Sequence, residues 1–425
     1  ISEENETALK AAALKGAWEK VIKQIEENDQ LPLLYDIEMP LSKVLSSMEV
    51  TGFLVDRENI QQYGAVLEEK INSLVSEIYD LAGEEFNINS PKQLGTILFE
   101  KLGLPAKKKT KSGYSTNADV LEGLAPDYPI VSLILEYRTL AKLKSTYCDG
   151  LQKCIAPDGR IHSTLNQTET KTGRISSTEP NLQNIPVRTP VGRELRKFFI
   201  AKEGCVLVDA DYSQIELRVL SDIANDETMI SAFNNGDDIH TITASQVFNM
   251  PVEAVTPLMR SRAKAVNFGI VYGIGAFSLA HDIGVTRAEA DKYIKGYLHH
   301  FSGVDSYMKN VIAKAKEDGY VQTLFKRRRY LPELAASNAM IRNFGERVAR
   351  NMPIQGTAAD IIKIAMVRVY DRLEKENLKS KLIMQIHDEL IVEAPENEQA
   401  QVQKIIREEM ENACKMKVKL TADVH

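Results

Sequence analysis

Two aspartates stand where an apolar segment ends. The segment GCVLVDADYS at residues 204–213 predicts a buried strand, and a helix is expected from Gln214. Because side chains alternate along a strand, Asp209 and Asp211 are expected on one face of it. An acid at such a position costs free energy unless it is solvated, hydrogen-bonded or bound to a metal. Two interpretations stay open, in which Asp211 or Ser213 caps the helix or the acids bind a metal ion.

Three consecutive ionisable residues, His387, Asp388 and Glu389, connect the apolar segments LIMQI and ELIVE. A two-residue hairpin turn favours Asn-Gly or a similar pair because both central residues take positive φ angles, and His-Asp suits such a turn poorly. Turn formation alone therefore does not account for these residues. Their oxygen atoms could bind a divalent cation at the tip of the hairpin. The alternative is an exposed polar loop, which is common between strands.

A third pattern lies in RSRAKAVNFGIVYG at residues 260–273. Arg260, Lys264, Phe268 and Tyr272 recur at every fourth position, so on a helix they form a stripe that drifts by about 40° per step over about 18 Å. The two cations could hold a polyphosphate, and the two aromatic rings could stack on a base. The alternative is a helix whose aromatic side chains lie in the core and whose cations extend to solvent.

Each pattern is weak by itself, but together they describe one chemistry. Two carboxylates from different strands, a cationic helix for a triphosphate, aromatic rings for a base and a basic arm for a duplex are the parts of two-metal nucleotidyl transfer. In that chemistry two Mg²⁺ ions, about 3.5–4 Å apart, activate the attacking hydroxyl and stabilise the departing pyrophosphate. The sequence therefore predicts a metal-dependent nucleotidyl transferase.

The elements that must position these residues follow from hydrophobic periodicity. Their order predicts a helical arm, an α+β region, a helical insertion and the rest of the α+β region. The expected elements are a charged helical segment at 1–35, a helix ending near Gly52, an amphipathic helix from Arg57 to Gly83, a Pro/Lys/Gly-rich loop at 90–114, a polar region with short strands at 143–200, mainly helices at 222–342, helices at 345–375 and 396–415, and a final strand KVKLTADV.

The composition restricts the class of protein. With 425 residues, 44% hydrophobic and 26% charged, the chain is too long for one compact core, and we expect two or three subdomains. The 53 Lys and Arg residues against 59 Asp and Glu residues argue against a uniformly basic protein that wraps nucleic acid. Basic residues nevertheless gather around 101–111 and in Lys326–Arg329. Such runs are usually solvated surface, and contact with nucleic acid is the alternative.

Neither the cysteines nor the chain's start suggests an exported protein. Cys148, Cys154, Cys205 and Cys414 have no CxxC spacing, so we expect neither a disulfide framework nor a zinc site. The sequence has no run of eighteen apolar residues, and its start lacks the order of a secretory signal. A soluble, cytoplasmic protein is the expectation.

The motifs resemble those of the family A DNA polymerases. DYSQIELR at 211–218 resembles the family's motif A, RSRAKAVNFGIVYG at 260–273 its motif B, and QIHDELIVEA at 385–394 its motif C. The resemblance extends over about residues 36–425. Further similar stretches are TGRISSTEPNLQNIPVR at 172–188, DIHTITA at 238–244 and NMPIQGTAADIIK at 351–363.

The resemblance implies a role for each matching residue. Asp211 and Asp388 would bind the metals with the Tyr212 carbonyl, and Glu389 would be an accessory acid in catalysis. Lys264 would also act in catalysis, near the pyrophosphate. The residues implied in nucleotide binding are Arg260, Lys264, Phe268, Tyr272, His240, Gln214 and Glu216, of which Glu216 would exclude a 2′-hydroxyl. The residues implied in DNA binding are Arg174, Gln355, His387, Arg347, Asn351, Lys107, Lys108, Lys109 and Lys111.

The fold implied is an α+β right-hand polymerase fold with an antiparallel-sheet palm, helical fingers and a helical thumb. The expected domains are a remnant of a proofreading-exonuclease-like domain with a connector at 1–35, connector and thumb at 36–134, palm at 135–220, fingers at 221–341 and the rest of the palm at 342–425. Because no acidic exonuclease motif precedes the remnant, proofreading is not expected of this chain.

The function implied is DNA-templated DNA polymerisation, in which deoxynucleoside monophosphates are added to a primer 3′-OH and pyrophosphate is released. The implied cofactor is Mg²⁺, as two ions, and the implied partners are primer-template DNA and dNTPs. The chain is expected to act as a monomer, away from membranes. Two alternatives stay open, a DNA-binding relative that has lost catalysis and a metal-dependent nuclease, which could also use paired carboxylates.

Overall fold

The computed structural model describes residues 3–106, 109–110, 113–185 and 190–425, and the chain divides into two compact units. Unit 1 comprises Ile1–Thr51, Thr164–Thr178 and Ala201–His425, and unit 2 comprises Gly52–Ser163 and Glu179–Ile200. Each unit is described by itself below.

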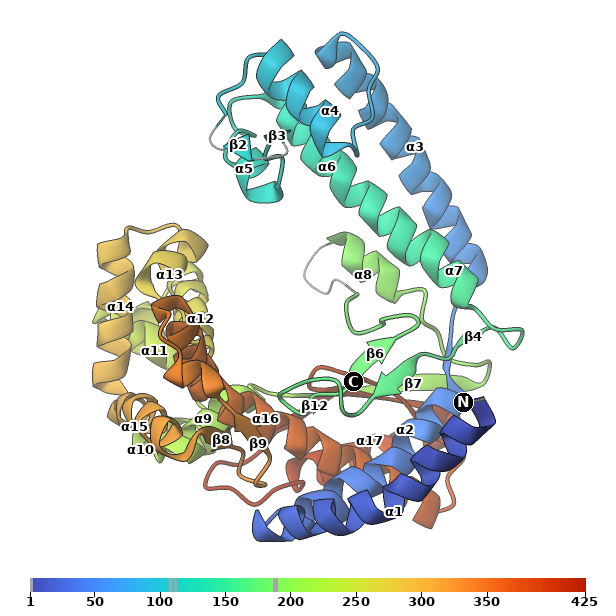
Figure 1. The fold of residues 1–425 in the computed structure, drawn as a ribbon, viewed down its shortest axis with the longest axis vertical. Coiled ribbons are helices and arrows are strands. Elements are labelled where there is room, and N and C mark those ends of the chain that lie inside the picture. Colours follow the sequence, from blue (N-terminus) through green and yellow to red (C-terminus); the bar gives the residue numbers. More distant parts are fainter. Residues whose placement is uncertain (1–2, 107–108, 111–112, 186–189) are drawn as a thin grey trace. The chain divides into compact units, whose positions relative to one another are not determined.

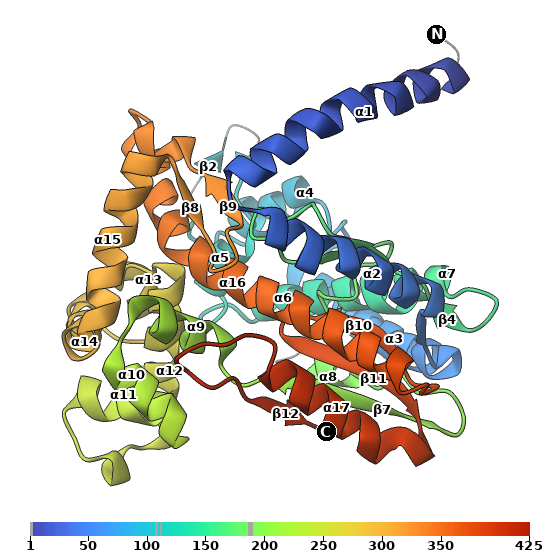
Figure 2. The same ribbon diagram turned by 90° about the horizontal axis from the view of Figure 1, so that it is seen from below.

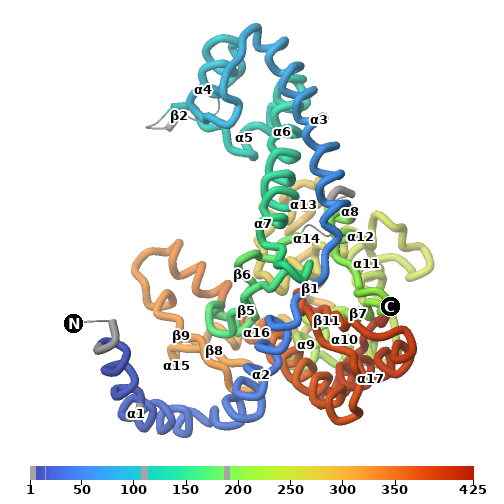
Figure 3. The backbone as a smooth tube through the Cα atoms, turned by 90° about the vertical axis from the view of Figure 1, so that its right-hand side faces the viewer, coloured from blue at the N-terminus to red at the C-terminus, as the bar shows by residue number. Residues whose placement is uncertain are grey.

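Unit 2 is built mainly from helices. Its two long helices, α3 (Arg57–Ala82) and α6 (Pro129–Leu143), lie side by side (Figures 1 and 3). Asp56 caps α3 through the backbone N–H of Asn59, and Gly83 ends it with a positive φ angle. The predicted helix from Arg57 to Gly83 is therefore confirmed. The other elements are β1 (Phe53–Leu54), α4 (Pro91–Gly95), β2 (Lys109–Thr110), β3 (Gly113–Tyr114), α5 (Ala118–Glu122), α7 (Gly150–Cys154), β4 (Arg160–Ile161), α8 (Pro190–Arg196) and two π-helical turns, Thr96–Lys101 and Lys144–Asp149.

Unit 1 contains a four-stranded antiparallel sheet with the strand order β10-β11-β7-β12. Its strands are β7 (Cys205–Tyr212), β10 (Lys381–Ile386), β11 (Glu389–Pro395) and β12 (Ala422–Val424). The predicted strand at 204–213 and the two strands around His387 are thus confirmed. The final strand is shorter than the segment KVKLTADV, because only its last residues pair with β7.

Helices account for most of the rest of unit 1. Beside the sheet, it has two small hairpins, β5 (Thr164–Asn166) with β6 (Ser176–Thr178) and β8 (Tyr320–Gln322) with β9 (Arg328–Tyr330). The helices are α1 (Glu3–Glu27), α2 (Met39–Thr51), α9 (Ile215–Ala224), α10 (Glu227–Asn235), α11 (Ile239–Phe248), α12 (Pro257–Tyr272), α13 (Ala276–Ile283), α14 (Arg287–His300), α15 (Ser302–Asp318), α16 (Ala339–Lys375) and α17 (Gln399–Glu411), with a π-helical turn at Leu33–Glu38 and 3₁₀ turns at Val252–Ala254, Pro332–Ala335 and Glu396–Glu398.

Two helices, α16 and α17, pack along the sheet of unit 1 (Figure 2). Alternation along β7 decides which side chains face them: Val208, Ala210 and Tyr212 are buried, and the Tyr212 hydroxyl donates to the Met410 carbonyl on α17 at 2.7 Å. Asp211 therefore points to the opposite face of the sheet, where part of its side chain stays accessible to solvent. The packing of one face positions the acid on the other.

The region 222–342 was predicted to be mainly helical, and the helices α10 to α15 confirm this. The prediction missed the hairpin of β8 and β9, whose Lys326-to-Arg329 segment looks like a charged surface run. It also placed the start of the long helix at 345, whereas α16 begins at Ala339 behind an Asn338 cap. Among the described residues, no helix is long and apolar enough to cross a membrane, and the four cysteines carry free thiols.

A buried ionic cluster lies beneath the turn that carries Arg174. Arg327 donates to Asp360 at 2.8 Å and also pairs with Glu38, to which Lys363 donates at 2.8 Å. Lys363 and Asp360 are completely buried. The Arg327 side chain fills the space beside Gly173, where a Cβ atom would lie 2.4 Å from its Nε. The expectation that the basic block is solvated surface is therefore wrong for Arg327.

The charges in this cluster depend on one another. Burial acts to raise the pKa of Glu38, but the charges of Lys363 and Arg327 outweigh it and hold the pKa below its ordinary value. Deeper burial prevails at Asp360 and raises the pKa of that carboxyl. We therefore regard Glu38 as the ionised partner on which the two cations depend.

Replacing Glu38 by Gln should lower the free energy of unfolding by about 3 kcal/mol at pH 7, because Lys363 and Arg327 would keep buried charges without enough compensation. A lowered pKa means that the ionised Glu38 stabilises the fold above its ordinary pKa and loses this effect as the pH falls through the lowered value. The difference between the wild type and Glu38→Gln should therefore shrink below about pH 4. Urea denaturation at both pH values measures it.

The matched control is Glu6→Gln, which breaks the exposed ion pair between Glu6 and Lys10. Its effect should stay below about 0.5 kcal/mol because water screens such a pair. Equal losses in the two variants would contradict the importance of the buried cluster.

Candidate active site

The register of the sheet brings the two predicted acids together. Glu389 on β11 lies opposite Asp211 on β7, and the Tyr212 N–H donates to the Asp388 carbonyl at 3.2 Å. The side chains of Asp211 and Asp388 come within hydrogen-bonding reach of each other. His387, between β10 and β11, has a φ angle of +55°, which is the strained turn geometry that the sequence indicated. The pair thus comes from two strands that are distant in the chain.

The electrostatics of this pair are unfavourable without a cation. Burial and the nearby charges of Asp388 and Glu389 raise the pKa of Asp211 to about 7. Burial likewise raises the pKa of Asp388. Asp423 on β12, opposite Asp211 in the ladder, adds a further negative charge. Crowded oxygen ligands of this kind suit a hard divalent cation such as Mg²⁺.

The described residues do not form a complete metal cage by themselves. Among them, no group of three or more His, Cys, Asp or Glu side chains is arranged to hold an ion. Mg²⁺ usually takes one or two protein carboxylates and completes its shell with water and substrate phosphates, so the Asp211 and Asp388 pair fits this ion. The remaining ligands would come from backbone, water or substrate.

Glu216 lies at the centre of a hydrogen-bonded group beside the acids. This side chain on α9 is buried, and it accepts from Arg174 at 2.6 Å and from the Tyr272 hydroxyl at 3.1 Å. Burial raises the pKa of Glu216 against the opposing effects of Arg174 and Tyr272. Asp388 is close enough to interact with both Glu216 and Arg174. The group therefore connects the end of α12 with the carboxylate pair.

Helix α16 supplies the neighbours of the aromatic end of α12. Gln355 hydrogen-bonds the Tyr272 side chain, and the Asn351 amide donates to the Val271 carbonyl at 3.2 Å. Arg347 packs beside Gly273, where a Cβ atom would meet its Cγ at 3.4 Å. The two helices contact each other, so residues 351–355 and the end of α12 form one surface.

The cationic end of α12 faces α11. Thr256 caps α12 and Pro257 follows at its first turn, which fixes where the helix starts. Arg260 pairs with Asp238 at 2.6 Å, and the Lys264 amine lies 5.9 Å from the centre of the Phe268 ring. His240 on α11 lies against the same ring at 5.9 Å. Tyr272 is half exposed, so the stripe is not simply a core face.

The structure therefore brings most of the predicted site residues of unit 1 into one connected group. Gln214 caps α9 in a left-handed conformation and holds a buried amide oxygen that has no partner among the described residues. Lys107, Lys108 and Lys111 lie outside the described residues, and Lys109 is described only through its place in β2.

Sequence reasoning missed Asp238 and Asn267, whose contacts depend on how α11 packs against α12. The signal for Asp238 was its position as a helix cap, because it accepts from the His240 and Thr241 N–H groups. The amide of Asn267 lies 2.9 Å from the His240 ring, but nothing in the stripe of every fourth residue points to it. Asp238 pairs with Arg260, and Asn267 hydrogen-bonds His240; the sequence did identify these two partners.

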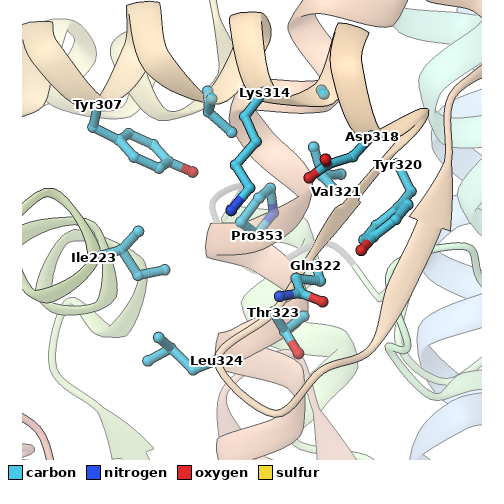
Figure 4. A pocket seen from close by; sticks show the side chains of 12 residues that line it. Ile223, Tyr307, Lys314, Asp318, Tyr320, Val321, Gln322, Thr323, Leu324 and Pro353 are labelled. Atoms are coloured by element: carbon cyan, nitrogen blue, oxygen red, sulfur yellow. The ribbon is translucent and has the colours of Figure 1, made fainter. Parts of the chain in front are cut away.

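A pocket of about 260 Å³ lies elsewhere in unit 1, between α15, the hairpin that follows it and Pro353 of α16 (Figure 4). Lys314, Tyr307 and Leu324 contribute to its lining, and the Lys314 amine points into it. Neither Asp211 nor Asp388 lines this pocket, and none of the stripe residues of α12 does. The candidate site is thus defined by the carboxylates and α12 rather than by this pocket.

Comparison with known proteins identifies relatives along most of the chain. The family model described as DNA polymerase family A matches residues 57–425. DNA polymerase I of Caldicellulosiruptor bescii is 52% identical over 412 residues, covering 97% of this chain and 48% of the relative. DNA polymerase I of Geobacillus stearothermophilus is 51% identical over 418 residues, covering 98% of this chain and 48% of the relative. The chain spans about half the length of these curated relatives.

Among solved structures, the POL domain of Pol1 from M. smegmatis, in complex with DNA primer-template and dNTP, matches with a TM-score of 0.89. It is 42% identical, and the match covers 95% of this chain and 71% of that one. The expected α+β polymerase fold is confirmed, and the described residues are mostly helical with small antiparallel sheets.

Replacing Asp211 by Asn should stabilise the protein when divalent cations are removed with a chelator. A carboxyl whose pKa is raised in the fold destabilises it wherever the group is forced to ionise, so the gain should be absent below about pH 4 and complete above about pH 7. We expect about 1 kcal/mol, since solvent screens part of the exposed carboxylate.

Thermal and urea unfolding at pH 4 and pH 8 measure this gain. Asp209→Asn on the same strand is the matched control and should change little at either pH. A loss of stability in Asp211→Asn at pH 8 would contradict the crowding of the acids.

Proposed function

Because the chain belongs to DNA polymerase family A, we propose that it extends a DNA primer along a DNA template. In this reaction the primer 3′-OH attacks the α-phosphate of a dNTP, a new P–O bond forms, and the bond to the β-phosphate breaks to release pyrophosphate. The observation that carries the proposal is the pairing of Asp211 with Asp388 in one unit with the cationic stripe of α12.

The residues present fit the two Mg²⁺ ions that the proposal requires. Asp211 and Asp388 would hold both ions, with the Tyr212 carbonyl as a further ligand and Glu389 as an accessory acid. Bound there, the metal would lower the pKa of the attacking hydroxyl and neutralise charge on the phosphates. The crowding of the acids supports this assignment because a bound cation would relieve their repulsion.

The cationic end of α12 would hold the triphosphate. Arg260 is oriented by Asp238, which accepts from its Nε and leaves the rest of the guanidinium for phosphate oxygens. Lys264 lies one turn further along the helix and would neutralise charge near the leaving pyrophosphate. His240 would contribute from α11, where its Nε2 is buried without a partner among the described residues.

The aromatic end would hold the sugar and base. Phe268 would pack on the incoming nucleotide and Tyr272 beside the template base. Glu216 would lie against the 2′ position of the sugar, with Gln214 beside it. Hydrogen bonds from Arg174 and Tyr272 would hold its carboxylate in place there. A fixed, buried carboxylate leaves no room for a 2′-hydroxyl, which supports preference for deoxynucleotides.

The primer-template duplex would contact residues around the same group. Arg174, Gln355 and His387 would face the primer terminus, with Arg347 and Asn351 along the same surface. Donors there can test the shape of a base pair in the minor groove, where acceptors are common to all pairs. Lys107, Lys108, Lys109 and Lys111 would grip duplex phosphates without sequence preference. The thumb would then lie within residues 36–134, the palm at 135–220 and 342–425, and the fingers at 221–341.

The proposal makes a primer-extension experiment decisive. With Mg²⁺ and all four dNTPs, the wild type should lengthen a labelled primer, whereas Asp388→Ala should be slower by about 10³-fold or more, since an acid that holds the metals is lost. Chelation of Mg²⁺ should stop extension. Asp209→Ala, on the same face of β7, is the matched control and should retain activity.

The same gel distinguishes the alternatives. A DNA-binding relative without catalysis would bind the duplex and leave the primer unchanged. A metal-dependent nuclease would give only shortened products. Either result would refute the polymerase assignment.

Replacing Glu216 by Ala should admit ribonucleotides more readily, because a shorter side chain leaves space for the 2′-hydroxyl. The ratio of kcat/KM for dNTP to kcat/KM for rNTP should fall by about 100-fold, an effect of about 2.7 kcal/mol. Single-nucleotide incorporation with both sugars measures it. An unchanged ratio would show that Glu216 does not set sugar selectivity, whatever the total activity.

A further inference from the structure

A row of three buried polar side chains joins α11 to α12. Thr243 and Asn267 are completely buried and His240 is 1% exposed. The Thr243 hydroxyl donates to the Asn267 amide oxygen at 3.1 Å, and the Asn267 amide nitrogen lies 2.9 Å from Nδ1 of His240. Buried polar groups of this kind normally form hydrogen bonds with one another, so each group's role as donor or acceptor can be deduced from its neighbour.

The direction of the hydrogen bonds follows from what each group can do. Because Thr243 donates to the oxygen of the Asn267 amide, the amide nitrogen is the atom that faces His240. An amide NH₂ only donates, so Nδ1 of His240 accepts. In a neutral imidazole whose Nδ1 accepts, the proton is on Nε2.

The row ends at Nε2 of His240, the ring nitrogen on the side away from Asn267. The Nε2 atom of His240 is buried and has no hydrogen-bond partner among the described residues. Arg260 and Lys264 are its charged neighbours on α12, and Asp238, which caps α11, is the acid beside it. A buried donor without a partner costs free energy, which a ligand oxygen would recover on binding.

We propose that Asn267 is a positioning residue that keeps the proton of His240 on Nε2, so that a neutral imidazole donates a hydrogen bond to a non-bridging phosphate oxygen of the incoming dNTP. This inference rests on the proposed function for the identity of the ligand. Asn267 itself does not touch the nucleotide and acts through His240.

The surroundings favour the neutral form of the ring. Burial, together with the charges of Lys264 and Arg260, lowers the pKa of His240 to about 4 against the opposing effect of Asp238. Two cations, Arg260 and Lys264, would already face the triphosphate at this end of α12. The ring therefore adds directional hydrogen bonding rather than more charge, and the position of its proton decides whether it attracts or repels a phosphate oxygen.

The ring nitrogen signals of His240 test the proposal directly. In the protein labelled with ¹⁵N-histidine, at neutral pH and without DNA or nucleotide, the His240 signals should show Nε2 protonated and Nδ1 unprotonated. The His240→Gln variant assigns them, because they disappear from its spectrum. A wild-type spectrum with Nδ1 protonated overturns the proposal without any variant.

Asn267→Asp should move the proton, since a carboxylate only accepts and therefore favours a protonated Nδ1. The Nδ1 signal should shift to the protonated position, and an unchanged signal would contradict the role of Asn267. The matched control is Ser245→Ala, which removes another buried hydroxyl of α11 that donates to the Met250 carbonyl. It should leave both ring signals in place.

Kinetics provide the second readout. Asn267→Leu should raise KM for dNTP about tenfold, the size expected for one hydrogen bond to a charged acceptor, with DNA affinity unchanged. In the His240→Gln background the same substitution should add little, because the glutamine amide carries its own donor. Additive effects in this double-mutant cycle would overturn action through His240. A wild type that extends no primer would refute the polymerase proposal, whereas the ring signals would still decide where the proton lies.

Discussion

Repulsion between carboxylates is the constraint on which the rest of unit 1 depends. The register between β7 and β11 forces Asp211, Asp388 and Glu389 into one place, and β12 adds Asp423. A fold tolerates such crowding only if packing elsewhere outweighs it. Here the opposite face of β7 is buried against α17, where the Tyr212 hydroxyl is bonded to the Met410 carbonyl. Packing on the buried face of β7 thus offsets the repulsion among the carboxylates on its other face.

Arg174 also depends on packing away from the site. This side chain ends at Glu216 in the site, but its turn lies on the ionic cluster of Glu38, Arg327, Asp360 and Lys363. At Gly356 a Cβ atom would lie 3.1 Å from the Thr172 carbonyl and 2.6 Å from Thr323, so the turn approaches α16 closely. The buried ionic cluster thus packs against the turn that places Arg174 beside Glu216.

Much of the fold could be predicted from local patterns. The strand at 204–213, the stripe helix and the strained tip at His387 follow from alternation, from the spacing of every fourth residue and from turn chemistry, all of which involve near neighbours in the chain. The β8 and β9 hairpin could not be predicted, because Arg327 and Arg328 read as charged surface until Asp360 and Asn28 are placed beside them. Asn267 was missed for the same reason, since its partners Thr243 and His240 lie on another helix.

The order of strands in the sheet has a consequence for biosynthesis. β7 lies between β11 and β12, both of which follow it by more than a hundred and seventy residues. As the chain leaves the ribosome, β7 has neither neighbour until almost all of unit 1 has been made. Its backbone N–H and C=O groups lack their ladder partners throughout that interval, and pairing over such distances is slow. The four-stranded sheet is thus completed only after almost all of unit 1 has been made, and the unpaired strand is open to aggregation until then.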